Sequence, residues 1–243
     1  MAKLREHRDR ILIVGAGGLG VPAAWALARA RVGHLTLIDL EAVELSNLAR
    51  QVIYRDADLG TPKVEAAARR LHESFPGTMI DPRRVELDSS NARAIVAAHD
   101  FIIDATDNPV AKFLINDACV AEHRSFVYGG VLATTGQAMS VVPASTPCLR
   151  CLFEEPPDEA ESASCREAGI VGPIAGAIGE VQAAEAIRVL RGEPPHLAGV
   201  MLTYDATNIP RIRLTPVDAR PRCGCGAYHP GAGASAAHGV PHE

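Results

Sequence analysis

The feature that constrains this chain most is an apolar segment that runs directly into a glycine-rich turn. Ile11–Val14 is continuously apolar, the turn Gly15–Gly20 follows it, and an alanine-rich helical stretch continues from Pro22 to Arg31. A second apolar segment, Leu35–Ile38, comes next. Two buried apolar strands joined by a helix form a right-handed crossover, which places them in a parallel sheet. The sequence therefore predicts an α/β fold with a Rossmann-like, doubly wound sheet.

The rest of the chain continues this alternation, and the later strands are expected to pair antiparallel. A single domain is predicted over residues 1–226, with a mobile acidic loop over Glu154–Ser164 and a disordered tail over residues 227–243. The further expected strands are Phe101–Ile103, Phe126–Val131, Gln137–Val142, Val200–Tyr204 and Arg211–Leu214, and the expected helices are Pro62–Leu71, Asn91–His99 and Ile174–Arg191.

Composition and charge narrow the class of protein. The chain has 243 residues, 47% of them apolar, and a net charge of −5, so no basic balance points to nucleic acid. The charged start, Met1–Arg10, does not resemble a signal peptide, and the apolar stretch Ala168–Gly179 is interrupted by Pro173 and is too short to span a membrane. We therefore expect a cytoplasmic protein, in which the six cysteines are thiols or metal ligands.

The glycine turn predicts a nucleotide site. Gly15 permits the tight turn, Gly17 lets backbone N–H groups approach a phosphate, and Gly20 lets the helix pack on the strand. The helix N-terminus adds partial positive charge, and Asp39 ends the next strand, where an acid binds ribose hydroxyls. This motif does not distinguish a dinucleotide cofactor from ATP, and a glycine turn used only for packing is the alternative to both.

Polar residues further along favour ATP. Asn47, Arg50 and Gln51 follow the acid closely, and Lys63 opens the next helix. Such a cluster of donors suits a triphosphate, whose oxygens gain charge as a leaving group departs, whereas each cation alone could be an ordinary solvated side chain.

The segment after the third strand adds carboxylates to this site. Asp104 and Asp107 lie at its carboxyl end, where doubly wound sheets bind ligands, and carboxylates there suit Mg²⁺. The alternative is that Asp107, Asn108 and Pro109 only cap the following helix.

These segments together resemble the MoeB/ThiF/HesA family, the bacterial relatives of ubiquitin-activating enzymes. The resemblance runs from about Arg10 to Cys225 and includes "DLEAVELSNLARQ", "GTPKVEAA", "DATDN", "CLRC" and "CREAGIVGPIAGAIGEVQAAEAI". It implies adenylation of the C-terminal glycine of a small ubiquitin-like or sulfur-carrier protein ending in Gly-Gly, with Mg²⁺ and ATP as donor and pyrophosphate as product.

The resemblance also implies roles for individual residues. Asp39 would bind the ribose, Asp107 would hold Mg²⁺, and the other expected nucleotide contacts lie around them. The expected catalytic residues are Arg50, Lys63, Asp107 and Cys165, and the expected nucleotide-binding residues are Gly15, Gly17, Gly18, Gly20, Asp39, Glu41, Asn47, Arg50, Gln51, Lys63 and Asp107. The nucleotide-binding half is expected over about residues 1–143, a crossover loop over about 153–168, and a zinc-linked half over about 144–226.

One family feature differs in this sequence. Family members carry an N-terminal helical segment with an arginine that reaches the partner subunit's ATP site, but only ten residues precede Ile11 here. Arg5, Arg8 or Arg10 are candidates to replace it.

Four of the cysteines predict a metal site. Cys148 and Cys151 form a C-x-x-C pair, and Cys223 and Cys225 form a C-x-C pair. Two such pairs suit a tetrahedral structural Zn²⁺, as in family members, and the alternatives are free thiols or a degenerate site with partial occupancy.

The other two cysteines differ in setting. Cys165 corresponds to a family cysteine that forms a covalent adduct with the activated carrier, and Arg166 beside it could stabilise the thiolate, although a loop cysteine without a catalytic task is equally compatible. Cys119 is expected in the core.

Partners and rival functions complete the predictions. The helix Ile174–Arg191 is apolar enough for a homodimer interface, although a buried core helix fits as well. A sulfurtransferase or conjugating enzyme would take over the activated carrier. The rival functions are an NAD-dependent oxidoreductase, which uses only the glycine turn and Asp39, and a nucleotide-binding, carrier-binding subunit without catalysis.

Overall fold

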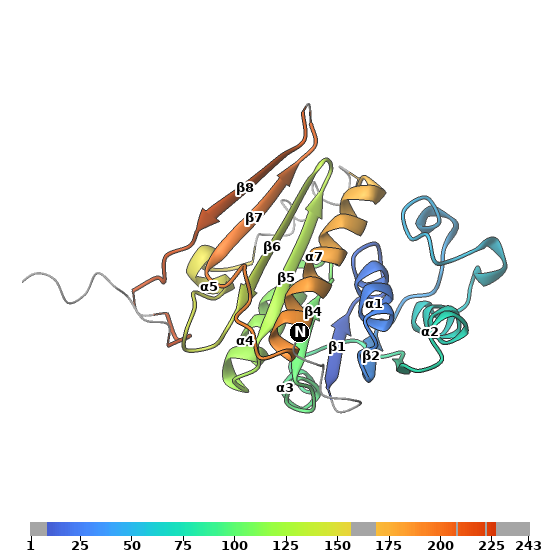
Figure 1. The fold of residues 1–243 in the computed structure, drawn as a ribbon, viewed down its shortest axis with the longest axis horizontal. Coiled ribbons are helices and arrows are strands. Elements are labelled where there is room, and N and C mark those ends of the chain that lie inside the picture. The colour runs from blue at the N-terminus through green and yellow to red at the C-terminus, as the bar shows by residue number, and fades with distance from the viewer. Residues whose placement is uncertain (1–8, 157–168, 208, 222, 227–243) are drawn as a thin grey trace, which may run out of the picture.

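The computed structural model describes residues 9–156, 169–207, 209–221 and 223–226, and its centre is one eight-stranded sheet with the order β3-β2-β1-β4-β5-β6-β7-β8 (Figure 1). The first five strands run parallel, and β6, β7 and β8 continue the sheet antiparallel. The strands are β1 (Arg10–Val14), β2 (His34–Ile38), β3 (Met79–Arg83), β4 (Phe101–Asp104), β5 (Phe126–Leu132), β6 (Thr135–Val141), β7 (Val200–Asp205) and β8 (Arg211–Pro216).

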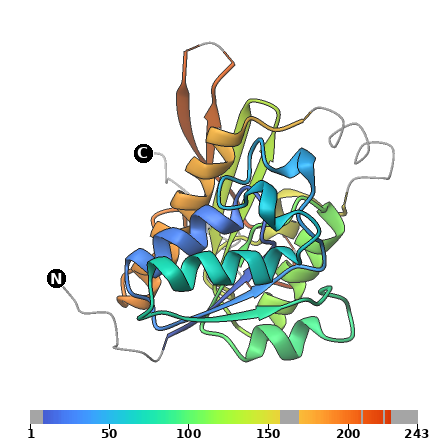
Figure 2. The same cartoon turned by 90° about the vertical axis from the view of Figure 1, so that its right-hand side faces the viewer.

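Helices cover both faces of the sheet (Figures 1 and 2). Helices α1 (Gly20–Arg29), α2 (Lys63–Ser74) and α7 (Gly172–Leu190) lie on one face, and α3 (Ala92–Ala97), α4 (Pro109–Ala121) and α5 (Leu149–Leu152) lie on the other. Two short 3-10 helices, η1 (Leu45–Asn47) and η2 (Asp56–Asp58), lie between β2 and α2.

The parallel strands are apolar on both faces because each face is buried under helices. Along β1, Ile11 and Ile13 pack into the core shared with α1 and α7, whereas Leu12 and Val14 pack into the core shared with α4. This alternation follows from the two-residue period of a strand. The prediction of a doubly wound sheet with later antiparallel strands is confirmed.

Strand β3 was not expected. Its sequence contains Asp81, Pro82 and Arg83, which are poor strand formers, but β3 lies at the edge of the sheet, where a proline costs no ladder hydrogen bond to a further strand. This segment forms a strand because it pairs with β2 over His34–Ile38, and not because its sequence has an apolar pattern.

Helix α7 packs inside this subunit. It lies against α1, β5 and β6 through eight buried residues: Ile174, Ala175, Ile178, Gly179, Gln182, Ala183, Glu185 and Ala186. Its main apolar face is therefore occupied within the core. Among the described residues, no helix combines the length and hydrophobicity that a bilayer crossing requires. Most of the expected crossover loop, including Cys165 and Arg166, and the expected tail lie outside the described residues.

Candidate functional site

The glycine turn has the geometry that its sequence predicts. Gly15 has a φ of +100°, a region that favours glycine, and a Cβ there would lie 2.7 Å from the carbonyl oxygen of Ala105. A Cβ on Gly20 would lie 1.8 Å from the carbonyl oxygen of Gly15, so only glycine lets α1 start this close to β1. The first and third glycines therefore bring the helix N-terminus to the carboxyl end of the strand.

A cleft of about 810 Å³ opens at this carboxyl end of β1, β2 and β4, and we call it the carboxyl-edge cleft. It gathers residues from four separate segments. Of the expected nucleotide-binding residues, it is lined by Gly15, Gly17, Gly18, Asp39, Glu41, Asn47, Arg50, Gln51, Lys63 and Asp107. Gly20 does not line the cleft and acts through helix packing.

A second hollow, of about 950 Å³, is larger but lies at the amino ends of β1 to β3. Arg10 lines it, and the backbone N–H of Arg10 donates to Asp100 at 2.8 Å. Within this subunit Arg10 therefore lies at the sheet edge opposite the carboxyl-edge cleft, and its expected role in a partner subunit's site stays a prediction. Arg5 and Arg8 lie outside the described residues.

Asp39 organises the glycine turn. Its Oδ2 accepts the N–H of Ala16 and its Oδ1 accepts the N–H of Glu41, both at 2.8 Å. Burial raises the pKa of Asp39, and these two N–H groups and the nearby Lys63 oppose that rise. Each carboxylate oxygen keeps a further lone pair, so Asp39 can also accept a ligand hydroxyl from the cleft.

Lys63 is the first residue of α2 and is buried in the cleft wall, with 4% of its surface exposed. Its ammonium forms an ion pair with the carboxylate of Glu41. The nearby Tyr54 hydroxyl donates to the carbonyl oxygen of Ala16 at 2.7 Å, and burial raises the pKa of Tyr54, so this donor stays protonated. The segment before α2 is thereby tied to the glycine turn.

The polar side chains around η1 have only some of their hydrogen-bonding groups paired within the protein. Arg50 donates to the carbonyl oxygen of Ser46 at 3.0 Å, and Asn47 Oδ1 accepts the N–H of Glu44 at 3.2 Å. Gln51 is 4% exposed, and its Oε1 has no hydrogen-bond partner among the described residues. This amide oxygen can therefore accept a hydrogen bond from a ligand hydroxyl or amino group, or from water, in the cleft.

The two aspartates after β4 have different roles. Asp104 is fully buried, and its carboxylate accepts the Thr106 hydroxyl at 2.7 Å and the Lys112 ammonium at 3.3 and 3.4 Å. The expectation that both acids face the ligand is therefore wrong for Asp104, because Lys112 neutralises it inside the protein.

Asp107 is exposed at the cleft, and no hydrogen bond or ion pair of its side chain is found among the described residues. The helix cap comes instead from Asn108, whose Oδ1 accepts the N–H of Val110 at 2.9 Å. The capping alternative therefore applies to Asn108, and the carboxylate of Asp107 is available to hold a cation.

One wall of the cleft was missed by sequence reasoning. It consists of the segment that follows β3 and of the first turns of α4: Val85, Glu86, Leu87, Asp88, Ser89, Val110, Ala111 and Leu114. The signal would have been recognition of β3, since the segment after a parallel strand reaches the same sheet edge.

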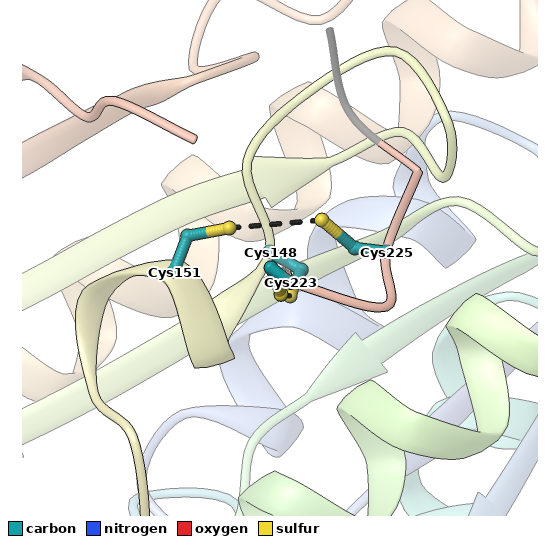
Figure 3. A group of neighbouring side chains, drawn as sticks. All are labelled: Cys148, Cys151, Cys223 and Cys225. Atoms are coloured by element: carbon teal, nitrogen blue, oxygen red, sulfur yellow. Dashed lines mark hydrogen bonds between the residues drawn. The ribbon is translucent and has the colours of Figure 1, made fainter. Parts of the chain in front are cut away.

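The four cysteines meet although they come from two segments that are 74 to 75 residues apart in the sequence (Figure 3). Cys148 Sγ lies 3.7 Å from Cys223 Sγ, Cys151 Sγ lies 3.6 Å from Cys225 Sγ, and all four sulfurs lie within 4.8 Å of one another. Tetrahedral Zn–S bonds of about 2.3 Å place sulfurs about 3.8 Å apart, so the cluster has the right size. We call these residues the cysteine cluster.

The cysteine cluster has the donor set of a metal site. Burial, first, and the three neighbouring cysteines raise the pKa of Cys148, so on its own this thiol stays protonated. Four thiolates could share this space only around a cation, and four thiolate sulfurs are a ligand set that Zn²⁺ takes. Cys119 is buried in the core, as expected.

Helix α4 connects the cysteine cluster to the cleft. Asn116 is buried and accepts the N–H of Leu149 at 2.9 Å, and Asp117 receives two hydrogen bonds from Arg150, at 2.7 and 2.8 Å. Leu149 and Arg150 lie between the first two cysteines. The helix that begins beside Asp107 thus contacts, in its second half, the segment that holds Cys148 and Cys151.

Comparisons with known proteins agree with this geometry. A sequence model described as the ThiF family matches residues 1–227. The chain is 40% identical over 215 residues to the SAMP-activating enzyme E1 of Haloferax volcanii, covering 88% of this chain and 79% of that protein. It is 40% identical over 225 residues to the sulfur carrier protein adenylyltransferase of Thermus thermophilus, covering 90% and 82%.

Two further comparisons concern longer proteins. The chain is 38% identical over 203 residues to the adenylyltransferase and sulfurtransferase MOCS3 of Culex quinquefasciatus, of which it spans 46%. Among solved structures, E. coli MccB with ATP matches with a TM-score of 0.79 at 20% identity, covering 91% of this chain and 67% of that one. At that identity the match concerns the fold alone.

Proposed function

This chain belongs to the ThiF family, and from that premise we propose that it is an adenylyltransferase that activates the C-terminal glycine of a ubiquitin-like or sulfur-carrier protein. The observation that carries the proposal is the joint placement of the glycine turn, Asp39, Arg50, Lys63 and Asp107 around one cleft. Relatives named for these activities are 40% identical to this chain over most of its length.

We assign the binding roles by position in the cleft. The backbone N–H groups of the turn and the N-terminus of α1 face the phosphates, and Asp39 accepts the ribose hydroxyls. Arg50, Lys63 and Asn47 neutralise or bind phosphate oxygens, and Gln51 completes its hydrogen bonding on the nucleotide. The apolar residues Val85, Leu87, Val110 and Leu114 form the wall on which adenine packs.

The reaction needs no protein nucleophile. A carboxylate oxygen of the terminal glycine attacks the α-phosphorus of ATP, a new P–O bond forms, and the bond to the β-phosphate bridging oxygen breaks, so that pyrophosphate leaves with the electron pair. Asp107 would hold Mg²⁺, which supplies neutralisation of phosphate charge when bound. The chain's own contribution is to orient two anions and to offset their repulsion with Arg50 and Lys63.

Further assignments rest on the family resemblance. Zn²⁺ in the cysteine cluster would tie the segments around Cys148 and Cys223 together. The thiolate of Cys165 would attack the acyl carbon of the carrier adenylate, so that a C–S bond forms, the acyl–phosphate C–O bond breaks and AMP leaves. A sulfurtransferase or conjugating enzyme then receives the carrier, and the subunit works in the cytoplasm as a homodimer.

The experiment is the exchange of labelled pyrophosphate into ATP in the presence of a candidate carrier ending in Gly-Gly. Exchange that depends on the intact carrier tail supports the proposal, and a carrier without its two terminal glycines is the control. Nucleotide binding without exchange for any candidate carrier would leave the carrier-binding, non-catalytic function. NAD binding with hydride transfer would favour the oxidoreductase, in which Arg50, Lys63 and Asp107 have no task.

A further inference from the structure

Glu41 and Lys63 are brought together by a short antiparallel contact between two loops. Ala42 and Pro62 form an isolated bridge, and the backbone N–H of Lys63 donates to the carbonyl oxygen of Glu41 at 2.9 Å. The N–H of Val43 donates to the carbonyl oxygen of Thr61 at the same distance. The backbone thus fixes both residues at the rim of the carboxyl-edge cleft, independently of their side chains.

The two side chains of this pair differ in exposure. The Lys63 side chain is 5% exposed, whereas that of Glu41 is 72% exposed. Within the described residues, Glu41 is the ion-pair partner found for the Lys63 ammonium. Lys63 is therefore held by the packing around it, and the carboxylate of Glu41 can rotate into solvent at little cost.

We propose that, without nucleotide, the Glu41 carboxylate occupies the position beside the Lys63 ammonium that a phosphate takes when ATP binds. The triphosphate displaces Glu41 from Lys63, and the ion pair forms again as pyrophosphate leaves. This inference rests on the proposed function. A polyphosphate that contacts Lys63 competes with Glu41, because both anions approach the same ammonium from the cleft that Lys63 and Glu41 line, and they repel each other. AMP offers no β- or γ-phosphate for Lys63, so its binding does not require the exchange. Glu41 thereby acts through Lys63 as a positioning residue that favours release of pyrophosphate.

The chain offers a matched control for this exchange. Glu44 is a second exposed acid that lines the same cleft, and its carboxylate accepts the Ser46 hydroxyl at 3.4 Å instead of pairing with Lys63. Glu41→Gln and Glu44→Gln remove the same charge from the same cleft. A general electrostatic effect would change the polyphosphate affinity of both variants equally, whereas displacement of Glu41 from Lys63 would change only the affinity of Glu41→Gln.

The test is calorimetric titration of the full chain with Mg²⁺-ATP, Mg²⁺-pyrophosphate and AMP. We expect Glu41→Gln to tighten ATP and pyrophosphate binding about three- to tenfold and to change AMP binding less than about twofold. Glu44→Gln should change all three by less than about twofold, and Glu41→Gln should have no effect in a Lys63→Met background.

Equal shifts in both glutamine variants, or weaker polyphosphate binding by Glu41→Gln, would overturn the inference while leaving the proposed function intact. A wild-type chain that binds no ATP would instead overturn the proposed function. Circular dichroism and thermal unfolding confirm that each variant is folded.

Discussion

The carboxyl-edge cleft takes its polar residues from several segments, most of which follow strands β1, β2, β3 and β4 at one sheet edge, whereas the cysteine cluster joins only two segments, 74 to 75 residues apart. In the cleft, Gln51 and Asp107 keep unused hydrogen-bonding capacity toward solvent or ligand. In the cysteine cluster, the four sulfurs lie within 4.8 Å of one another (Figure 3). Unused capacity at an open edge suits a ligand that enters and leaves, and a closed set of soft donors suits a permanent ion.

This difference predicts that substitutions in the cysteine cluster mainly lower stability, whereas substitutions in the carboxyl-edge cleft mainly lower activity. An exposed ligand-binding residue such as Asp107 contributes little to folding, whereas a structural metal ligand contributes to folding directly. Helix α4 connects both regions, so its contacts determine how far they are independent.

The largest expected effect is on stability, at the cysteine cluster. Cys223→Ser removes one of four thiolates, and we expect the bound metal to be lost and the free energy of unfolding to fall by on the order of 5 kcal/mol. Metal content by mass spectrometry and denaturant unfolding measure both. Cys119→Ala, a buried cysteine outside the cysteine cluster, should keep the metal and lose less than about 1.5 kcal/mol. Wild-type protein purified without metal would contradict the comparison.

The next effect is on activity, at the cleft. Asp107→Ala should reduce carrier-dependent pyrophosphate exchange by about 10³-fold, or about 4 kcal/mol of transition-state stabilisation, because the expected Mg²⁺ ligand is lost. The free energy of unfolding should change by less than about 0.5 kcal/mol, since the side chain is exposed. Asp56→Ala removes an exposed acid outside the cleft lining and serves as the control. Normal exchange by Asp107→Ala would remove this residue from the mechanism.

The sequence was sufficient for features that depend on local pattern. Gly15, Gly20 and Asp39 were predicted because a strand, a turn and a helix follow one another directly, so their geometry is determined over a few residues. The expectation that Asp104 faces the ligand was wrong for two reasons. Its partner Lys112 lies eight residues later on α4, and the neighbouring strands bury its carboxylate.

Other features are set by tertiary contacts and had no sequence signal. The cleft wall over residues 85–89 follows β3, whose pairing with β2 compensates for poor strand propensity. The ion pair of Glu41 and Lys63 depends on the bridge between Ala42 and Pro62. The cysteines were grouped as candidate ligands from their spacing, but only the folded chain brings both pairs together.

A smaller effect is expected where the two regions meet. The Lys112 ammonium contacts Asp104 and the carbonyl oxygen of Gly129 at 2.5 Å, and its side chain is 11% exposed. Lys112→Met leaves the buried carboxylate of Asp104 without its cation but with its hydrogen bonds from Thr106, so the free energy of unfolding should fall by about 3 kcal/mol. Arg93→Met breaks an exposed ion pair with Glu122 and should cost less than about 1 kcal/mol. Equal losses in the two variants would show that the Asp104 pair is no more important than a surface pair.

The smallest effect concerns how the free energy of unfolding depends on pH. Acid is expected to destabilise both the parallel half of the sheet and the cysteine cluster, and a histidine variant separates the two contributions. His99 is 1% exposed and contacts the Thr36 hydroxyl at 2.8 Å and the Ile95 carbonyl at 2.7 Å. Burial lowers the pKa of His99 below 6.5, so the unfolded chain binds a proton more readily than the folded one. Stability is therefore complete above about pH 6.5 and falls below it, by at most about 1.4 kcal/mol per pH unit for this residue. Denaturant unfolding between pH 7 and pH 5, on the order of two pH units, should show a shallower loss for His99→Gln than for wild type, with His72→Gln on α2 as the exposed control. An unchanged slope would assign the acid sensitivity to the thiolates of the cysteine cluster, where protons compete with the metal.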